Sequence, residues 1–222
     1  MPQRNIVVAN GEIYHVLNRG VGSQEIFRNP TDYIRFTSLL DYYQLENPSL
    51  SYSQYLELSS DSKLAYMETY STNRKIIEVY AYCLMNNHFH LLLRQVNNNG
   101  IYDYFRKVQN AYVKYFNLKY NRNGTLFQSR FQAKWIESEE IFLHVSRYIH
   151  LNPCTAYIVR INNLVNYRWS SYSKYAVSKD TSFVNTKKLT GILGGKLQYQ
   201  EFVQNQSDYQ RKLAKIKHLV LE

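Results

Sequence analysis

The feature that most constrains this chain is a His-Phe-His triplet, His88 to His90, inside an otherwise apolar run. Residues 89–93 are predicted to form a β-strand, entered from a tight turn at Asn86-Asn87. Side chains two apart on a strand share a face, so the imidazoles of His88 and His90 point one way while Phe89 points the other. Two imidazoles converging from a rigid strand make half of a metal site. Alternatively, they are two histidines on a solvent face.

The composition favours a partner that carries negative charge. The chain has 222 residues, of which 27 are Lys or Arg and 17 are Asp or Glu, giving a formal net charge of +10. Such an excess is typical of proteins that bind polyanions. The 22 tyrosines suit stacking on exposed bases as well as core packing.

The cysteines and the apolar runs exclude several classes of protein. Cys83 and Cys154 are far apart, so neither a zinc ribbon nor a disulfide framework is expected, and two scattered thiols fit a reducing compartment. The N-terminus lacks the apolar region of a signal peptide, and no apolar run approaches the length of about 18 residues that a membrane span needs. We expect a soluble, cytoplasmic protein with no membrane contact.

The order of the predicted elements is β-α-β-β-α-β followed by a helix, which is the ferredoxin-like α+β arrangement with an antiparallel sheet. Because helices cover one sheet face in that architecture, we expect His88 and His90 on the open face. Strands are predicted at residues 12–18, 76–83, 89–93 and 131–136, and helices at residues 31–43, 101–115 and 138–152.

Two further segments complete the predicted organisation. Residues 1–152 are expected to form the main domain, with a polar, partly helical insertion at about 46–73, and residues 153–222 a C-terminal helical extension ending in the basic run 211–217. The helix 138–152 is predicted to end near Asn152, because Pro153 disfavours α geometry in the residue before it.

The helix 138–152 carries a polar file beside its apolar stripe. His144, Tyr148 and Asn152 follow one another at intervals of four residues and therefore share a side of the helix. Tyrosine forms covalent intermediates when activated, so Tyr148 is a possible nucleophile. The amide oxygen of Asn152 is a hard ligand that suits Mg²⁺ or Mn²⁺ better than zinc. Among 22 tyrosines, ordinary packing is the alternative for any one.

A basic tract extends from Tyr104 to Trp135, where nine aromatic residues are interleaved with seven basic residues and no acidic residue occurs. Such a tract suits a groove that follows phosphates and stacks bases on rings, although some of the rings belong to the core. With Arg19 added from the turn after the first strand, the predicted nucleic-acid contacts are Arg19, Arg106, Lys107, Lys114, Arg122, Arg130 and Lys134.

Five segments together resemble the HUH single-tyrosine transposases, most closely their REP-associated branch. They are Tyr-His-Val-Leu-Asn-Arg-Gly at 14–20, the run 80–93 around the histidines, Gly-Thr-Leu-Phe-Gln-Ser-Arg-Phe at 124–131, Tyr-Ile-His-Leu-Asn-Pro at 148–153 and Trp-Ser-Ser-Tyr at 169–172. The family usually has Pro where this chain has Asn86, and the segment 46–73 is longer than usual. Neither departure removes a catalytic group.

The resemblance implies a role for each site residue. His88, His90 and Asn152 would bind Mg²⁺ or Mn²⁺, and Tyr148 would attack a DNA phosphate. The resulting 5′-phosphotyrosine conserves the bond energy, so nicking and strand transfer need no nucleotide cofactor. Single-stranded or hairpin DNA is the expected partner. The short connection before Tyr148 lets it reach a site in its own subunit, which slightly favours a monomer over a homodimer.

Two alternatives and several assignments remain open at the level of sequence. The chain could be a DNA-binding protein derived from a transposase that no longer cuts, or a metal-dependent nuclease in which water attacks and Tyr148 only packs. His144 could orient the phenol or be structural. His15 and His150 are assigned to packing or solvent.

Overall fold

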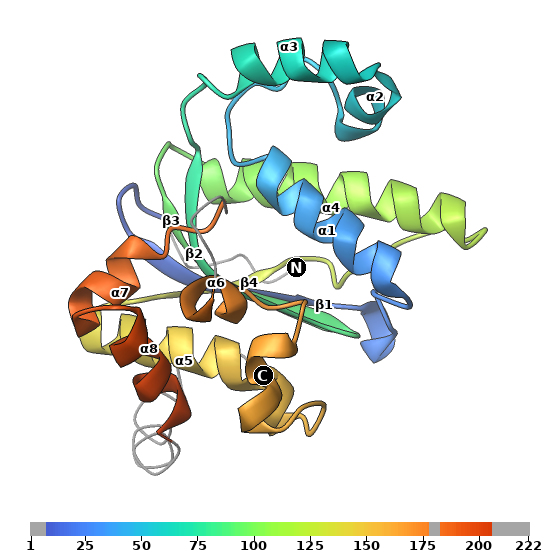
Figure 1. Ribbon diagram of the computed structural model, residues 1–222. Helices are drawn as coiled ribbons and strands as arrows, with labels where there is room; N and C mark the ends of the chain where they lie inside the picture. The colour runs from blue at the N-terminus through green and yellow to red at the C-terminus, as the bar shows by residue number, and fades with distance from the viewer. Residues whose placement is uncertain (1–7, 178–182, 206–222) are drawn as a thin grey trace.

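The computed structural model describes residues 8–177 and 183–205, which fold around one antiparallel four-stranded sheet (Figure 1). The strand order is β2-β3-β1-β4, which is the order of a ferredoxin-like sheet and confirms the predicted fold class. The strands are β1 (Ile13–Arg19), β2 (Ile77–Met85), β3 (His88–Gln95) and β4 (Gln132–Trp135). Met85 pairs with His88, so Asn86 and Asn87 form the two-residue hairpin turn that was predicted.

Helices cover both faces of the sheet, because α1 (Pro30–Tyr42) and α4 (Gly100–Lys119) lie on one side and α5 (Glu139–Thr155) on the other (Figure 1). Strand β3 follows the expected alternation: Phe89 contacts the rings of Phe36 and Phe105 from α1 and α4, whereas His90 faces Tyr148 of α5. The expectation that the histidines lie on an open face was therefore wrong. The apolar stripe of α5 covers that face, and His90 is 1% exposed.

Helix α5 also extends past its predicted end. It continues through Pro153 to Thr155 instead of stopping near Asn152. A proline near the end of a helix removes only one backbone hydrogen bond, here the one to the carbonyl of Ile149. The buried residues of the last two turns, from Tyr148 to Pro153, offset that loss by packing against their neighbours.

The polar insertion forms two short helices, α2 (Tyr52–Glu57) and α3 (Ser60–Tyr70), which lie beyond the end of α1 (Figure 1). Tyrosines hold them in place: the Tyr42 ring of α1 contacts the rings of Tyr55, Tyr66 and Tyr70, and its hydroxyl is 2.8 Å from that of Tyr66. Much of the unusual tyrosine content therefore serves internal packing, which was one of the two roles expected.

The chain after α5 forms short helical segments that pack against α5 and the β2 edge of the sheet. They are η2 (Ile161–Asn166), α6 (Tyr172–Ala176), α7 (Lys187–Leu193) and α8 (Lys196–Gln204). Between η2 and α6 the backbone pairs with β2, because Leu84 N donates to Trp169 O and Ser171 N donates to Tyr82 O. The predicted basic run 211–217 lies outside the described residues. None of the helices in the described part of the chain could cross a membrane.

His150 joins these pieces in the interior. Its ring is fully buried on α5, with Nε2 2.8 Å from the Ser171 hydroxyl and Nδ1 2.8 Å from the Tyr199 hydroxyl of α8. The same Ser171 hydroxyl accepts a hydrogen bond from the backbone N–H of Tyr82 in β2. The packing role expected for His150 is thus confirmed, and the residue links α5, α8 and β2.

This buried histidine predicts a loss of stability in acid. Burial lowers the pKa of His150 to about 3, whereas the imidazole of an unfolded chain titrates near 6.5. The unfolded state therefore binds an extra proton between those values, and stability falls as the pH drops through that window, by about 1.4 kcal/mol per pH unit for one proton. In His150→Gln, urea unfolding should show a lower free energy of unfolding at pH 7.5. Below pH 6.5, the slope of that free energy against pH should correspond to the uptake of about one proton fewer on unfolding. An unchanged slope would contradict this assignment.

Candidate active site

The two histidines of β3 lie beside residues of both neighbouring strands. In the sheet register, Leu17 and Cys83 flank His90, while Arg19 pairs with His88. Paired residues in an antiparallel sheet project to the same face, so Arg19 and the two imidazoles all point toward the side covered by α5. The His88 and His90 ring centroids are 5.0 Å apart.

Hydrogen bonds fix one nitrogen of each imidazole. His88 Nδ1 is 2.6 Å from Asn87 Oδ1, and His90 Nδ1 is 3.0 Å from His15 Nε2. Since the Asn87 oxygen can only accept, His88 Nδ1 carries the proton, and His90 donates to His15 when its own Nδ1 is protonated. The Nε2 lone pairs of His88 and His90 are then available as ligands, and a partner on the opposite nitrogen is what metal-binding histidines usually have.

Burial and a nearby cation keep these imidazoles neutral. Loss of solvent, and to a smaller extent the positive charge of Arg19, lower the pKa of His88 to about 4. The pKa of fully buried His90 lies well below its usual value, first because of burial and then because of His15, His88 and Arg19. Neutral imidazole is the form that binds metals, so both rings are ready ligands at neutral pH.

Tyr148 packs against the same histidines from α5. Its ring centroid is 5.6 Å from that of His90 and 6.0 Å from that of His15, both in edge-on geometry, and the residue is 8% exposed. The helix that carries Tyr148 begins directly after β4, so the tyrosine and the histidines of one chain meet without a second subunit.

The other two members of the polar file on α5 differ in their surroundings. The Asn152 amide donates to the Tyr148 carbonyl at 3.1 Å, which leaves Oδ1 as the side-chain atom that could bind a cation. His144 Nδ1 accepts from Arg147 at 3.0 Å, and its ring lies 5.4 Å from that of Phe202. Within the described residues, no three His, Cys, Asp or Glu side chains form a metal-binding group, so a metal here would need the Asn152 oxygen or a ligand from the substrate.

The predicted nucleic-acid contacts fall into two groups on opposite faces. Arg19 and Lys134 share the histidine face, since Lys134 pairs with His15 in the sheet. Arg106, Lys107 and Lys114 belong to α4 on the other face, where Arg106 forms an ion pair with Asp103 at 3.0 Å. Arg122 donates to Gln24, and exposed Arg130 borders a cavity that Arg106 also lines. The structure does not bring the tract together as one groove.

His15 is the site residue that sequence reasoning missed. It is fully buried, and its ring stacks on that of His90 with centroids 5.2 Å apart. The sequence contained an indication of this role. In a ferredoxin-like sheet the first and third strands are neighbours, and alternate residues of a strand share a face. A histidine at an alternate position of the first strand can therefore lie on the same face as His88 and His90.

Comparisons with known proteins agree with this geometry. Residues 53–152 match a family model described as IS200-like transposase, a segment that contains β2, β3, α4, β4 and α5 as far as Asn152. A solved structure of the REP-associated tyrosine transposase bound to a REP hairpin has the same fold, with a TM-score of 0.53 at 14% identity over 78% of this chain and 84% of that chain. A search of curated protein sequences finds no significant match.

The antiparallel four-stranded sheet, with Tyr148 of α5 packed against His90 of β3, belongs to the fold that this chain shares with that solved structure. The family model matches residues 53–152, less than half of the chain, and supports the resemblance to the IS200-like transposases, while the solved structure shows a shared fold.

The pairing of Arg19 with His88 can be tested by titration. Removing the cation in Arg19→Gln should raise the pKa of His88 above about 4, yet leave it below 6.5 because burial, the larger cause, remains. Histidine ring resonances followed by NMR against pH would report the shift. Arg94→Gln is the matched control, since Arg94 lies at the other end of β3 in an ion pair with Glu78. Equal titration curves in all three proteins would contradict the proposed coupling.

Proposed function

We propose that this protein nicks single-stranded or hairpin DNA and transfers the strand through a 5′-phosphotyrosine intermediate formed on Tyr148. The observation that supports this most directly is the contact between Tyr148 and His90 in one chain, with ring centroids 5.6 Å apart. A nucleophile must lie beside the group that activates the phosphate, and this packing supplies that proximity. A monomer is then sufficient for the chemistry.

His88, His90 and Asn152 would hold a divalent cation, Mg²⁺ or Mn²⁺. The donor set fits: both imidazoles are neutral with Nδ1 already hydrogen-bonded, and the Asn152 amide leaves Oδ1 available. When bound, the cation would polarise the scissile phosphate and stabilise the charge that develops on it. His15 would act through His90, whose ring it orients from the far side.

The chain's own groups define how the phosphate would arrive. His90 and Tyr148 are nearly buried, whereas His88 and its neighbour Arg19 are partly exposed, so the site is accessible from the β2–β3 hairpin end of the sheet. Arg19 would bind the phosphate as it enters. Tyr148 would then attack in line, and the leaving 3′-oxygen would depart as a hydroxyl while the DNA stays joined to the tyrosine. No bond energy is lost, so no nucleotide cofactor is required.

Two further observations bear on the DNA partner. The solved relative of the same fold is bound to a REP hairpin, which favours hairpin DNA here. Arg19 and Lys134 on the histidine face are the basic residues best placed to contact the cleaved strand. The α4 residues Arg106, Lys107 and Lys114 would contact DNA only where it passes around the sheet.

Replacing Tyr148 by Phe is the decisive test, because it removes the attacking oxygen and keeps the ring. With labelled hairpin DNA and Mn²⁺, the unmodified protein should form an adduct that survives denaturation. Tyr148→Phe should bind the same DNA and form neither adduct nor nick. Tyr157→Phe is the matched control. Because Tyr157 is 95% exposed, the Tyr157→Phe protein should still cleave DNA.

Each contrary result would identify an alternative. A Tyr148→Phe protein that still nicks DNA would mean that water attacks, as in a metal-dependent nuclease. An adduct in that variant would place the nucleophile on another tyrosine. Binding with neither nick nor adduct in the unmodified protein, over a pool of hairpins, would favour a DNA-binding protein that no longer cuts.

The metal requirement gives a separate prediction. EDTA should abolish cleavage and added Mg²⁺ or Mn²⁺ should restore it. His88→Ala and His90→Ala should remain folded but lose Mn²⁺ binding by at least about tenfold, which electron paramagnetic resonance of free Mn²⁺ measures without relying on activity. Undiminished cleavage in EDTA, or equal Mn²⁺ binding in the variants, would contradict the assignment of these ligands.

A further inference from the structure

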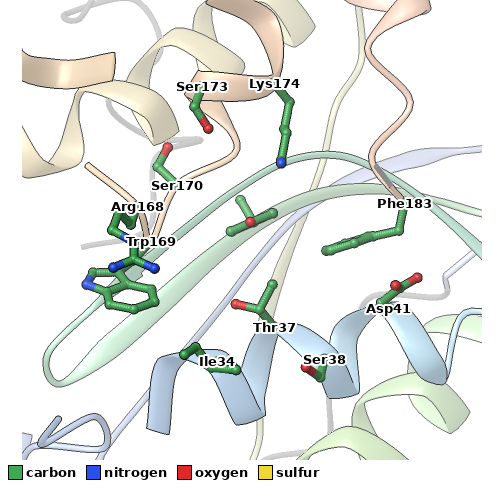
Figure 2. Close-up of a pocket in the computed structure, with 11 residues that line it drawn as sticks. Ile34, Thr37, Ser38, Asp41, Arg168, Trp169, Ser170, Ser173, Lys174 and Phe183 are labelled. Carbon is green, nitrogen blue, oxygen red and sulfur yellow. The ribbon is translucent and has the colours of Figure 1, made fainter. Parts of the chain in front are cut away.

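A second cavity, of about 470 Å³, lies at the β2 edge of the sheet, between α1 and the segment that leads into α6 (Figure 2). It includes Trp169 and Ser170, from the Trp-Ser-Ser-Tyr motif that has no part in the proposed chemistry. In Figure 2, Arg168 and Trp169 lie at one end, Phe183 and Asp41 at the other, and Lys174 reaches toward the space between them.

Rigid aromatic rings form both ends of the cavity. At one end Trp169 stacks on Tyr33 with centroids 4.5 Å apart, and Tyr33 stacks on buried Phe27 at 4.6 Å. The Arg168 guanidinium lies 5.5 Å from the centroid of the Trp169 ring. At the other end Phe183 stacks on Tyr82 at 5.6 Å, with only 7° between the ring planes. A flat, aromatic ligand can extend the Phe183–Tyr82 stack at little entropic cost, because these rings are already held in place.

The positive and negative side chains that line the cavity lie at different ends of it. Arg168 and Lys174 form no ion pair with any carboxylate of the described residues, so one part of the cavity is positively charged. At the opposite end Asp41 accepts a long side-chain hydrogen bond of 3.4 Å from Gln44. Burial raises the pKa of Asp41, and nearby Lys75 partly opposes that shift. The hydroxyls of Thr37, Ser38, Ser170 and Ser173 complete the polar lining.

The cavity lies on the α1 face of the sheet, whereas His90 of the proposed active site faces α5 on the other side. Ser170 forms a bridge to Cys83 of β2, and Cys83 pairs with His90 of β3. Neighbouring strands lie about 4.8 Å apart, so the backbone of Ser170 is about 10 Å from that of His90 in the plane of the sheet. A strand whose phosphate reached His88 and His90 would have to pass around the β2–β3 hairpin end of the sheet, beside Trp169, to place a nearby nucleotide in the cavity.

We propose that this cavity binds one unpaired nucleotide of the DNA strand near the cleavage point, with its phosphate on Arg168 and Lys174 and its base between Phe183 and Asp41. The proposal rests on the proposed function for the identity of the strand. It makes the Trp-Ser-Ser-Tyr motif a specificity element: Ser171 fixes the segment to β2 and His150, while Trp169 and Ser170 line the cavity.

The position of Asp41 also selects the base. An ionised carboxylate only accepts hydrogen bonds, so the base must present N–H donors to it. Guanine presents two donors side by side on its Watson–Crick edge and can satisfy both carboxylate oxygens at once. Thymine presents a single N–H between two carbonyl oxygens, which the carboxylate would repel. The cavity should therefore prefer guanine and discriminate against thymine.

Trp169 provides a direct reporter of occupancy. The chain has two tryptophans, so in a Trp135→Phe background the tryptophan fluorescence, excited at wavelengths that tyrosine does not absorb, comes from Trp169 alone. Titration with dGMP, dAMP, dCMP, dTMP and inorganic phosphate should quench it saturably, with dGMP acting at the lowest concentration and phosphate at the highest. Asp41→Asn should weaken the binding of dGMP by about tenfold while changing the affinity for dTMP by less than about twofold. Lys174→Gln should weaken the binding of all four nucleotides.

Several outcomes would overturn the proposal. They are quenching that does not saturate, an identical response to all four nucleotides, or affinities unchanged in Asp41→Asn and Lys174→Gln. Failure of this site and failure of the proposed function are distinguishable, because the Tyr148 adduct is measured separately. Normal adduct formation with no nucleotide binding would reject the cavity alone. Base-selective binding with no adduct on any DNA would reject the nicking activity alone.

Discussion

The docking of α5 on the histidine face of the sheet is the interaction on which the site depends. The apolar residues of α5 bury that face, and in the same step Tyr148 is placed against His90 and His15. Burial then determines the protonation state, since a desolvated imidazole beside Arg19 stays neutral. A histidine pair that would titrate near pH 6.5 in water is thereby kept in the form that binds a metal.

The segment after α5 secures this arrangement. His150 is hydrogen-bonded to Ser171 and Tyr199, which ties α5 to the β2 edge and to α8. Since α5 carries Tyr148 two residues before His150, the contacts that fix the helix also fix the proposed nucleophile. The C-terminal helices thus support the site mechanically, and the same chain segment forms the wall of the cavity beside it. The packing of this segment would then both support Tyr148 and form the proposed nucleotide-binding cavity.

Some predictions from the sequence failed for identifiable physical reasons. The continuous basic tract from Tyr104 to Trp135 is divided in space, because it begins on α4 and ends on β4, where Lys134 points to the opposite face from α4. Charge along a sequence says nothing about which side of a sheet each residue takes. The end of α5 was placed too early because a local preference against helix before Pro153 was outweighed by tertiary packing.

The sequence by itself determined the strand that carries His88 and His90, the order of the elements, the spacing of Tyr148 and Asn152 and the family resemblance, because periodicity and motifs are local properties. Only the tertiary structure decided which residues meet. His15 joins His90 through strand pairing across 75 residues, and Ser170 comes within two strands of it through the return of the chain to β2. Such contacts arise from the packing of distant segments, where the burial of apolar faces, rather than any local pattern, selects the partners.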